Sequence, residues 1–266
     1  MEPSQLAACR AVAIDLARRA GAIQREAYGR KVAVRMKGTI DLVTEVDQAC
    51  EELVVKGLTE HFPEHGILAE EGGGHAADHP CEWIVDPLDG TTNFAHKFPF
   101  FCVSIGLVVA GTPTLGVVYA PMLDELFVAR KGAGVTLNGT PVAVSETDAL
   151  VRSMLVTGFA YNVHQAADDN LDHFADFTRR ARATRRTGSA ALDLCYVACG
   201  RFDGFWEMGL KPWDVAAGVL AVTEAGGRVS RFDGLPHTLD GAQVVASNGR
   251  IHQAMVDTLM HPGKGG

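Results

Sequence analysis

The chain has 266 residues, of which 47% are hydrophobic, and its 24 basic and 32 acidic side chains give a net charge of −8. A chain of this size can bury one large core or two smaller lobes. The acidic balance argues against a broad basic surface for nucleic acid or an anionic membrane, and no stretch reaches the roughly 18 consecutive apolar residues of a membrane span.

The six cysteines are scattered, and no two of them form a C-x-x-C pair. Cys195 and Cys199 lie four residues apart, a spacing more typical of two small residues in a helical core than of a disulfide. Free thiols indicate a reducing compartment. The LAAC string at residues 6–9 resembles a lipoprotein cleavage box, but the residues before it contain no basic start and no apolar run. We therefore expect a soluble, cytoplasmic protein.

The first half of the sequence predicts two helices followed by strands. Apolar residues recur at helical spacing over residues 4–28, and a second helix is expected to end near residue 59. Residues 34–41, between the helices, are expected to form a polar, glycine-containing loop. Short apolar runs predict strands at 67–69, 101–109, 114–120 and 125–130. Asn138-Gly139 is a strong signal for a tight turn, so an antiparallel sheet of hairpins is expected.

Residues 61–65 (HFPEH) match the H-x-x-E-H pattern of some zinc proteases. That chemistry places both histidines on one face of a helix. Pro63 would break such a helix, so we expect a loop here rather than a zinc-protease site.

The sequence turns polar at residues 143–148, where we expect a boundary between an N-terminal lobe (1–145) and a C-terminal lobe (146–266). Strands and helices alternate beyond it, which predicts an α/β lobe. The strands are expected at 153–157, 184–187, 202–207, 228–231 and 243–247, and the helices at 168–182, 189–199, 213–225 and the C-terminus.

One stretch, WIVDPLDGTTNF at residues 83–94, gives the clearest chemical signal. A strand-like apolar run leads to Asp86 and Asp89 and then to a turn of small residues. Carboxylates at a strand end can hold a hard cation such as Mg²⁺. The backbone N–H groups and hydroxyls of a turn rich in Gly and Thr suit a phosphate. The stretch therefore predicts both the metal ligands and the phosphate-binding turn of a metal-assisted phosphate site.

Three further acids lie at the ends of predicted elements. Asp47 and Asp214 come where helices begin, and Glu70 follows the strand at 67–69. Taken singly, the two aspartates would serve as helix caps and Glu70 would lie in a solvated loop. Gathered without cations, Glu70, Asp214 and the two aspartates of residues 83–94 would raise their pKa values at a cost in stability. Two or three Mg²⁺ ions would remove that cost.

These motifs together resemble the inositol monophosphatases, which belong to a superfamily of Mg²⁺-dependent, lithium-sensitive phosphatases that also contains the fructose-1,6-bisphosphatases. The resemblance runs from about residue 5 to residue 250. Besides residues 83–94, its motifs are the strings at 41–47, 69–71, 188–191, 213–218 and 224–227. It implies a layered α/β (α+β) fold, an αβαβα sandwich, and usually a homodimer.

The resemblance also implies the metal ligands and the catalytic residues. The first Mg²⁺ is expected on Glu70, Asp86 and the carbonyl of Leu88. The second is expected on Asp86, Asp89 and Asp214, and a weaker third would use Glu70. The expected catalytic residues are Asp47, Thr91 and Glu70, the first two because they would orient the water nucleophile.

The substrate is expected to lie against the same residues. By the resemblance, the Gly90-Thr91 turn would take the phosphate oxygens, next to Leu88, Asp89 and Asp214. The alcohol portion would face Gly188, Ser189, Ala190 and Glu207. Lys37 belongs to a loop that closes over the site in this family.

The expected activity is Mg²⁺-dependent hydrolysis of myo-inositol monophosphate. Two cations can activate a water and stabilise the leaving alkoxide, so no covalent nucleophile is required. The same chemistry on histidinol phosphate, fructose-1,6-bisphosphate or a 3′-phosphoadenosine nucleotide is the nearest alternative, although Glu207 favours a polyol. An alternative of another class is a protein that binds the transcription and RNA-processing machinery, as some bacterial relatives do. The acidic charge argues against direct binding of nucleic acid.

Overall fold

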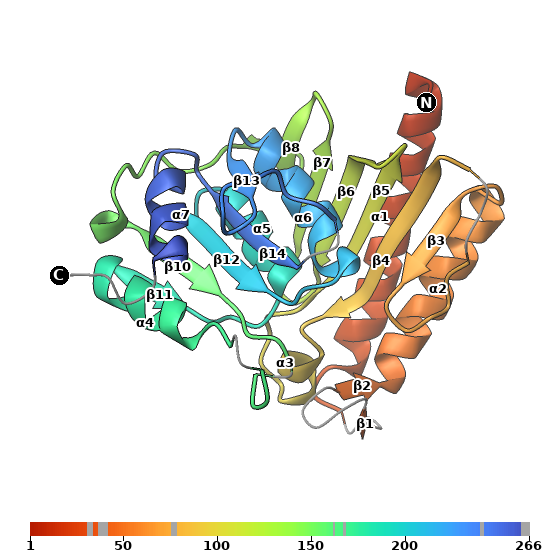
Figure 1. Ribbon diagram of the computed structural model, residues 1–266. Coiled ribbons are helices and arrows are strands. Elements are labelled where there is room, and N and C mark those ends of the chain that lie inside the picture. Colours follow the sequence, from red (N-terminus) through yellow and green to blue (C-terminus); the bar gives the residue numbers. More distant parts are fainter. Residues whose placement is uncertain are drawn as a thin grey trace.

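The computed structural model describes residues 1–30, 34–36, 42–75, 79–161, 163–166, 169–239 and 242–261. In this part of the chain, the two larger sheets alternate with three layers of helices, and β1 and β2 form a separate two-stranded sheet (Figure 1). The expected αβαβα sandwich is therefore confirmed. None of the described helices is long and apolar enough to cross a membrane.

The first helical layer consists of α1 (Pro3–Ala27) and α2 (Glu45–His61), which pack on one face of the larger sheet. Its seven strands are, in spatial order, β3 (Gly66–Ala69), β4 (Cys81–Asp89), β5 (Cys102–Val109), β6 (Thr112–Ala120), β7 (Glu125–Arg130), β8 (Gly134–Leu137) and β9 (Thr140–Val142). From β4 onward every pair is antiparallel, as the hairpin signals predicted, whereas β3 runs parallel to β4.

The middle layer consists of α5 (Ala190–Ala198) and α6 (Pro212–Glu224), and the outer layer of α4 (Leu171–Arg180) and α7 (His252–Met260). Between them lies a five-stranded sheet of β11 (Ala183–Arg185), β10 (Met154–Thr157), β12 (Gly204–Met208), β14 (Gln243–Ser247) and β13 (Arg228–Ser230), in spatial order. Two short helices, α3 (Thr91–Ala95) and η1 (Leu150–Arg152), complete the fold. Because α6 packs on the larger sheet and α5 packs on α6, the two predicted lobes share this middle layer.

Helix α6 lies unusually close to the larger sheet because small residues face each other. Gly106 on β5 and Gly116 on β6 are paired across the sheet. A Cβ atom at Gly116 would lie 2.8 Å from the carbonyl oxygen of Ala217 on α6, and one at Gly106 would lie 3.0 Å from the Cβ of Ala216. The two glycines therefore allow the start of α6 to reach the strands of the larger sheet.

Some local predictions were wrong. The loop expected at residues 34–41 contains strand β1 (Val34–Met36), which pairs antiparallel with β2 (Leu42–Thr44). Lys37, and Asp41 of the motif at 41–47, lie outside the described residues. In contrast, α2 ends at His61 and a loop follows, as Pro63 predicted, and Asn138 and Gly139 both have the positive φ of a tight hairpin turn.

Candidate active site

Four carboxylates come together where β3 and β4 end and α6 begins. Glu70 directly follows β3, and its backbone N–H donates to the carbonyl of Val85 on β4 (3.2 Å). Asp86 and Asp89 lie on β4, with an irregularity in the β4–β5 pairing between them. Asp214 is the third residue of α6. The parallel β3–β4 pair and the closely packed α6 thus bring together acids that are distant in sequence.

Burial and mutual repulsion raise the pKa values of these acids. Asp86 is 2% exposed, and burial together with the charges of Glu70, Asp89 and Asp214 raises the pKa of its carboxyl well above the usual range. Burial and then Asp89 do the same to the pKa of Asp214. Burial raises the pKa of Asp89 to about 6. A hard divalent cation would relieve this repulsion, and an all-oxygen set of ligands is the kind that such a cation prefers.

Asp89 connects the end of β4 to the start of α5. Its Oδ2 accepts hydrogen bonds from the Ser189 hydroxyl and from the backbone N–H of Ala191, each at 2.7 Å. The thiol of Cys102 lies 3.8 Å from the same oxygen. These contacts fix the carboxylate and leave Oδ1 for a cation.

Asp47 is both a helix-capping residue and a partner of Thr91. The Thr44 side chain caps α2, and Asp47 Oδ2 accepts a hydrogen bond from the Thr44 backbone N–H (2.9 Å). Asp47 Oδ1 accepts a hydrogen bond from the Thr91 hydroxyl (2.8 Å), and the carbonyl of Leu88 lies 3.1 Å from that hydroxyl. A Thr91 hydroxyl that donates to Asp47 has its own oxygen available to accept a hydrogen bond from water. The pair can therefore orient a water molecule beside the carboxylates.

The turn after β4 depends on Gly90 and Asn93. Gly90 has φ of 99°, and a Cβ atom there would lie 3.0 Å from the carbonyl oxygen of Phe100. The Asn93 side-chain amide donates to the carbonyls of Phe100 (2.7 Å) and Thr187 (2.8 Å). Asn93 therefore holds the turn against the segment that leads into Gly188. The sequence predicts only a turn at Asn93, because Thr187 lies 94 residues away along the chain.

Glu207 on β12 belongs to the same charged cluster. It is 7% exposed, and burial followed by the charges of Asp193, Asp214 and Asp89 raises the pKa of its carboxyl well above the usual range. A Cβ atom at Gly158 would collide with this carboxylate. Because Gly158 has no side chain, Glu207 keeps its position beside Asp214.

The structure thus places the predicted site residues in one connected region. Ser189 differs from expectation in one respect, because its side chain is buried and bonds to Asp89, so only the backbone of this segment is available to face a substrate. The region contains Asp47, Glu70, Asp86, Leu88, Asp89, Gly90, Thr91, Gly188, Ser189, Ala190, Glu207 and Asp214.

Glu51 on α2 was not predicted, yet it holds the turn that carries Glu70. It is 4% exposed, and its two carboxylate oxygens accept hydrogen bonds from the backbone N–H groups of Glu71 and Gly73, each at 2.7 Å. Both bonds fix the backbone directly after Glu70. This role has no signal in the sequence, since an acidic residue within a helix usually lies on the surface.

On the expectation from the sequence that Glu70 binds Mg²⁺, replacement of Glu51 by Gln should raise the Mg²⁺ concentration for half-maximal activity by about tenfold, the effect typical of losing a partner that positions a metal ligand. An amide retains one acceptor oxygen, so one of the two backbone N–H groups loses its bond. The measurement is phosphate release against Mg²⁺ concentration, where the rate at saturating Mg²⁺ should change little. Glu52→Gln, at the exposed neighbouring position, is the matched control. An unchanged Mg²⁺ requirement in Glu51→Gln would contradict the role of Glu51.

The chain is similar to known proteins over most of its length. The model of the inositol monophosphatase family matches residues 5–261. The chain is 46% identical to the inositol-1-monophosphatase of Synechocystis sp. over 259 residues, which cover 97% of this chain and 90% of that protein. It is 43% identical over 251 residues to the Nus factor SuhB of Salmonella typhimurium, with 93% of this chain and 94% of that protein covered.

The fold agrees as well. A solved structure of inositol monophosphatase from Anabaena superposes with a TM-score of 0.89 at 42% identity, and the match covers 97% of both chains. The family inferred from the sequence motifs is therefore confirmed. The chain belongs to the inositol monophosphatase family, whose members are phosphoric monoester hydrolases.

Proposed function

We propose that this protein hydrolyses myo-inositol monophosphate to inositol and inorganic phosphate, with Mg²⁺ as its cofactor. The observation that carries the proposal is the group of four buried or half-buried carboxylates beside the hydrogen-bonded pair of Asp47 and Thr91. The family supplies the reaction class, and the name of the Synechocystis relative supports the inositol substrate.

We assign the carboxylates to two Mg²⁺ ions, with a third bound more weakly. Glu70, Asp86 and the carbonyl of Leu88 would hold the first, and Asp86, Asp89 and Asp214 the second, with Glu70 available to the third. The raised pKa values of Asp86 and Asp214 support this assignment, because such a cluster is costly without cations. Bound there, the cations would activate a water, neutralise the phosphate and stabilise the leaving oxygen.

The residues of the chain would position the reactants. The Thr91 hydroxyl donates a hydrogen bond to Asp47, which leaves the Thr91 oxygen to accept a hydrogen bond from the attacking water. A water held in this way would turn its lone pairs toward the phosphorus. The backbone N–H groups of the Gly90-Thr91 turn would bind phosphate oxygens. Asn93 holds this turn in place.

The alcohol portion would lie between Glu207 and the backbone of residues 188–190. A carboxylate on β12 can accept hydrogen bonds from the hydroxyls of a polyol ring, and its burial makes these bonds strong. The charge of Arg186 partly offsets the burial and the acidic neighbours that raise the pKa of Glu207, and its guanidinium lies 4.9 Å from the centre of the Phe159 ring, so this side of the site also offers a cation. These groups favour a hydroxyl-rich substrate over an apolar one.

The test is release of inorganic phosphate from myo-inositol 1-phosphate, with Mg²⁺ and with EDTA, and with lithium titrated into the Mg²⁺ reaction. We expect release that requires Mg²⁺, is inhibited by lithium, and is faster than on histidinol phosphate, fructose-1,6-bisphosphate or 3′-phosphoadenosine nucleotides. A preference of about tenfold or more in kcat/KM for another ester would correspond to about 1.4 kcal/mol and would change the substrate but not the reaction.

The relative named Nus factor SuhB supports a second candidate function, binding to the transcription machinery. The complete set of carboxylates favours catalysis over a purely binding role. Phosphatase activity distinguishes the two functions. Recovery of transcription factors by a chain that releases no phosphate from any ester would favour the binding role. We also propose a homodimer and a cytoplasmic location, which size-exclusion chromatography and fractionation would test.

A further inference from the structure

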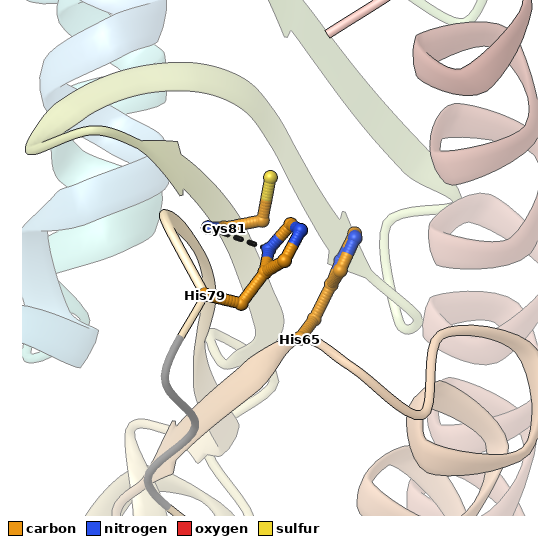
Figure 2. A group of neighbouring side chains, drawn as sticks. All are labelled: His65, His79 and Cys81. Carbon is orange, nitrogen blue, oxygen red and sulfur yellow. Dashed lines mark hydrogen bonds between the residues drawn. The ribbon is translucent and has the colours of Figure 1, made fainter.

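A second group of metal-binding side chains lies at the other end of β3 and β4 from the carboxylates. His65 directly precedes β3, while His79 precedes β4 and Cys81 begins it. One potential ligand atom from each residue lies within 4.8 Å of the others. Figure 2 shows the two imidazole rings side by side, with the sulfur of Cys81 next to them. The rings are stacked, with centroids 5.1 Å apart.

We propose that His65, His79 and Cys81 bind one Zn²⁺ ion, at a site separate from the catalytic carboxylates. Imidazole nitrogen and thiolate sulfur are the ligands that Zn²⁺ prefers, whereas Mg²⁺ takes oxygen ligands. The two sites would therefore select different ions. Asp86 is five residues beyond Cys81 on β4, and strand residues rise about 3.3 Å each, so the sites are roughly 16 Å apart. A cation at the new site would not touch the substrate.

Cys9 of α1 is the nearest candidate for a fourth ligand, although its thiol would have to move toward the ion, because only the other three residues have ligand atoms within 4.8 Å of one another. It lines the same surface cavity of about 520 Å³ as the other three residues. Burial, followed by the neighbouring charge of Cys81, raises the pKa of its thiol to about 11, which places the two thiols near each other. Two histidines and two cysteines form one of the common tetrahedral sets for structural zinc.

Metal binding must replace existing hydrogen bonds. The indole N–H of Trp83 donates to Nδ1 of His65, and the backbone N–H of Cys81 donates to Nδ1 of His79, each at 3.1 Å. In a neutral imidazole only one ring nitrogen has a free lone pair, and here that nitrogen is Nδ1, which accepts the hydrogen bond. A metal on Nδ1 displaces the donor. A metal on Nε2 moves the ring hydrogen to Nδ1, which then no longer accepts. The thiol must also release its proton to the solvent. Binding should therefore strengthen as the pH rises, and Trp83 should report it.

The site would also stabilise the protein. Its ligands come from the loop before β3, the start of β4 and, with Cys9, helix α1, so one ion would join three segments. An ion bound at this distance from the carboxylates would stabilise the fold without taking part in the reaction. We expect Zn²⁺ to raise the Tm without activating phosphate release.

The test is titration of Zn²⁺ into the metal-stripped full-length protein, with excess Mg²⁺ present to fill the carboxylate cluster. Equilibrium dialysis should give one Zn²⁺ per chain, and tryptophan fluorescence should change over the same range. Co²⁺ in place of Zn²⁺ should give a thiolate-to-metal absorption band. Cys81→Ser should remove that band and weaken Zn²⁺ binding by at least about tenfold. Cys199→Ser, at a half-buried thiol directly after α5, should leave both the absorption band and Zn²⁺ binding unchanged.

His79→Gln is a second variant for the case in which Cys81→Ser does not fold, because His79 is only half-buried. It should weaken Zn²⁺ binding by a similar factor. Unchanged Zn²⁺ binding in both variants would overturn the proposal. Zn²⁺ binding that is lost in Asp86→Asn instead would also overturn it, because the ion would then lie among the carboxylates.

Discussion

The variant Asp89→Asn is expected to release phosphate at least about a thousandfold more slowly than the wild type while it keeps its fold, since a metal ligand contributes several kcal/mol to the transition state. An amide oxygen can take the place of Oδ2 and keep the bonds from Ser189 and Ala191. The amide nitrogen then stands where Oδ1 would bind the cation, and the negative charge is lost. The measurement is kcat for phosphate release at saturating Mg²⁺.

The same variant should be more stable than the wild type when metal is absent. Asp86 and Asp214 each have a raised pKa partly because of the charge on Asp89. Removing that charge reduces the repulsion, so the Tm in EDTA should rise by a few degrees. The increase in Tm on adding Mg²⁺ should be smaller than in the wild type. Asp172→Asn, at an exposed acid on α4, is the matched control and should change neither the activity nor the rise in Tm that Mg²⁺ produces. Turnover like that of the wild type in Asp89→Asn would contradict the metal assignment.

The parts of the fold that could be predicted are those with short-range signals. Asn138-Gly139 predicts a hairpin because both residues tolerate positive φ, and the structure has that turn. The continuous apolar run of β5 predicts a buried strand, and helices cover both faces of its sheet. Strand β1 was missed because three residues are too few to show alternation.

The site could be predicted where neighbouring residues in one motif indicate the chemistry, and it could not where a residue's role depends on a partner far away in the sequence. The string at 83–94 contains Asp86 and Asp89 together, so a metal role for them could be predicted from local residues. Asn93 lies in the same string, but its function depends on Thr187, which only folding brings near. Glu51 likewise looks like any helical acid until the turn after Glu70 packs against it. The HFPEH string shows the opposite case, since the zinc site that we propose for His65 depends on His79 and Cys81 outside the motif.

The stabilisation that Mg²⁺ gives the folded protein is expected to grow with pH. In the metal-free fold, burial raises the pKa of Asp89 to about 6, and burial with neighbouring charges raises those of Asp86 and Asp214 well above 3.8, the usual value. Above about pH 4, the folded state therefore binds more protons than the unfolded state, so its free energy of unfolding falls as the pH rises through the raised pKa values. Bound Mg²⁺ keeps these carboxylates ionised, which removes that loss.

His252 has the opposite effect on stability, but it does not affect the difference in Tm between the Mg²⁺-bound and the metal-free protein. Burial lowers its pKa to about 4 from 6.5, so it favours unfolding as the pH falls below its usual value. It is hydrogen-bonded to Ser230 and Ser247 in the second sheet, and it contributes equally with and without Mg²⁺. The difference between the two Tm values therefore reports the carboxylates alone.

The measurement is the Tm in saturating Mg²⁺ minus the Tm in EDTA, from about pH 5 to about pH 8. One displaced proton changes the free energy of unfolding by about 1.4 kcal/mol per pH unit, and about 1 kcal/mol shifts the Tm of a chain of this size by roughly 2 °C or more. The difference should therefore grow by at least about 5 °C over this range. It should grow less in Asp89→Asn, which has one acid fewer to titrate. A difference that stays constant with pH would mean that Mg²⁺ binds elsewhere, and the four carboxylates would then lose their assignment as its ligands.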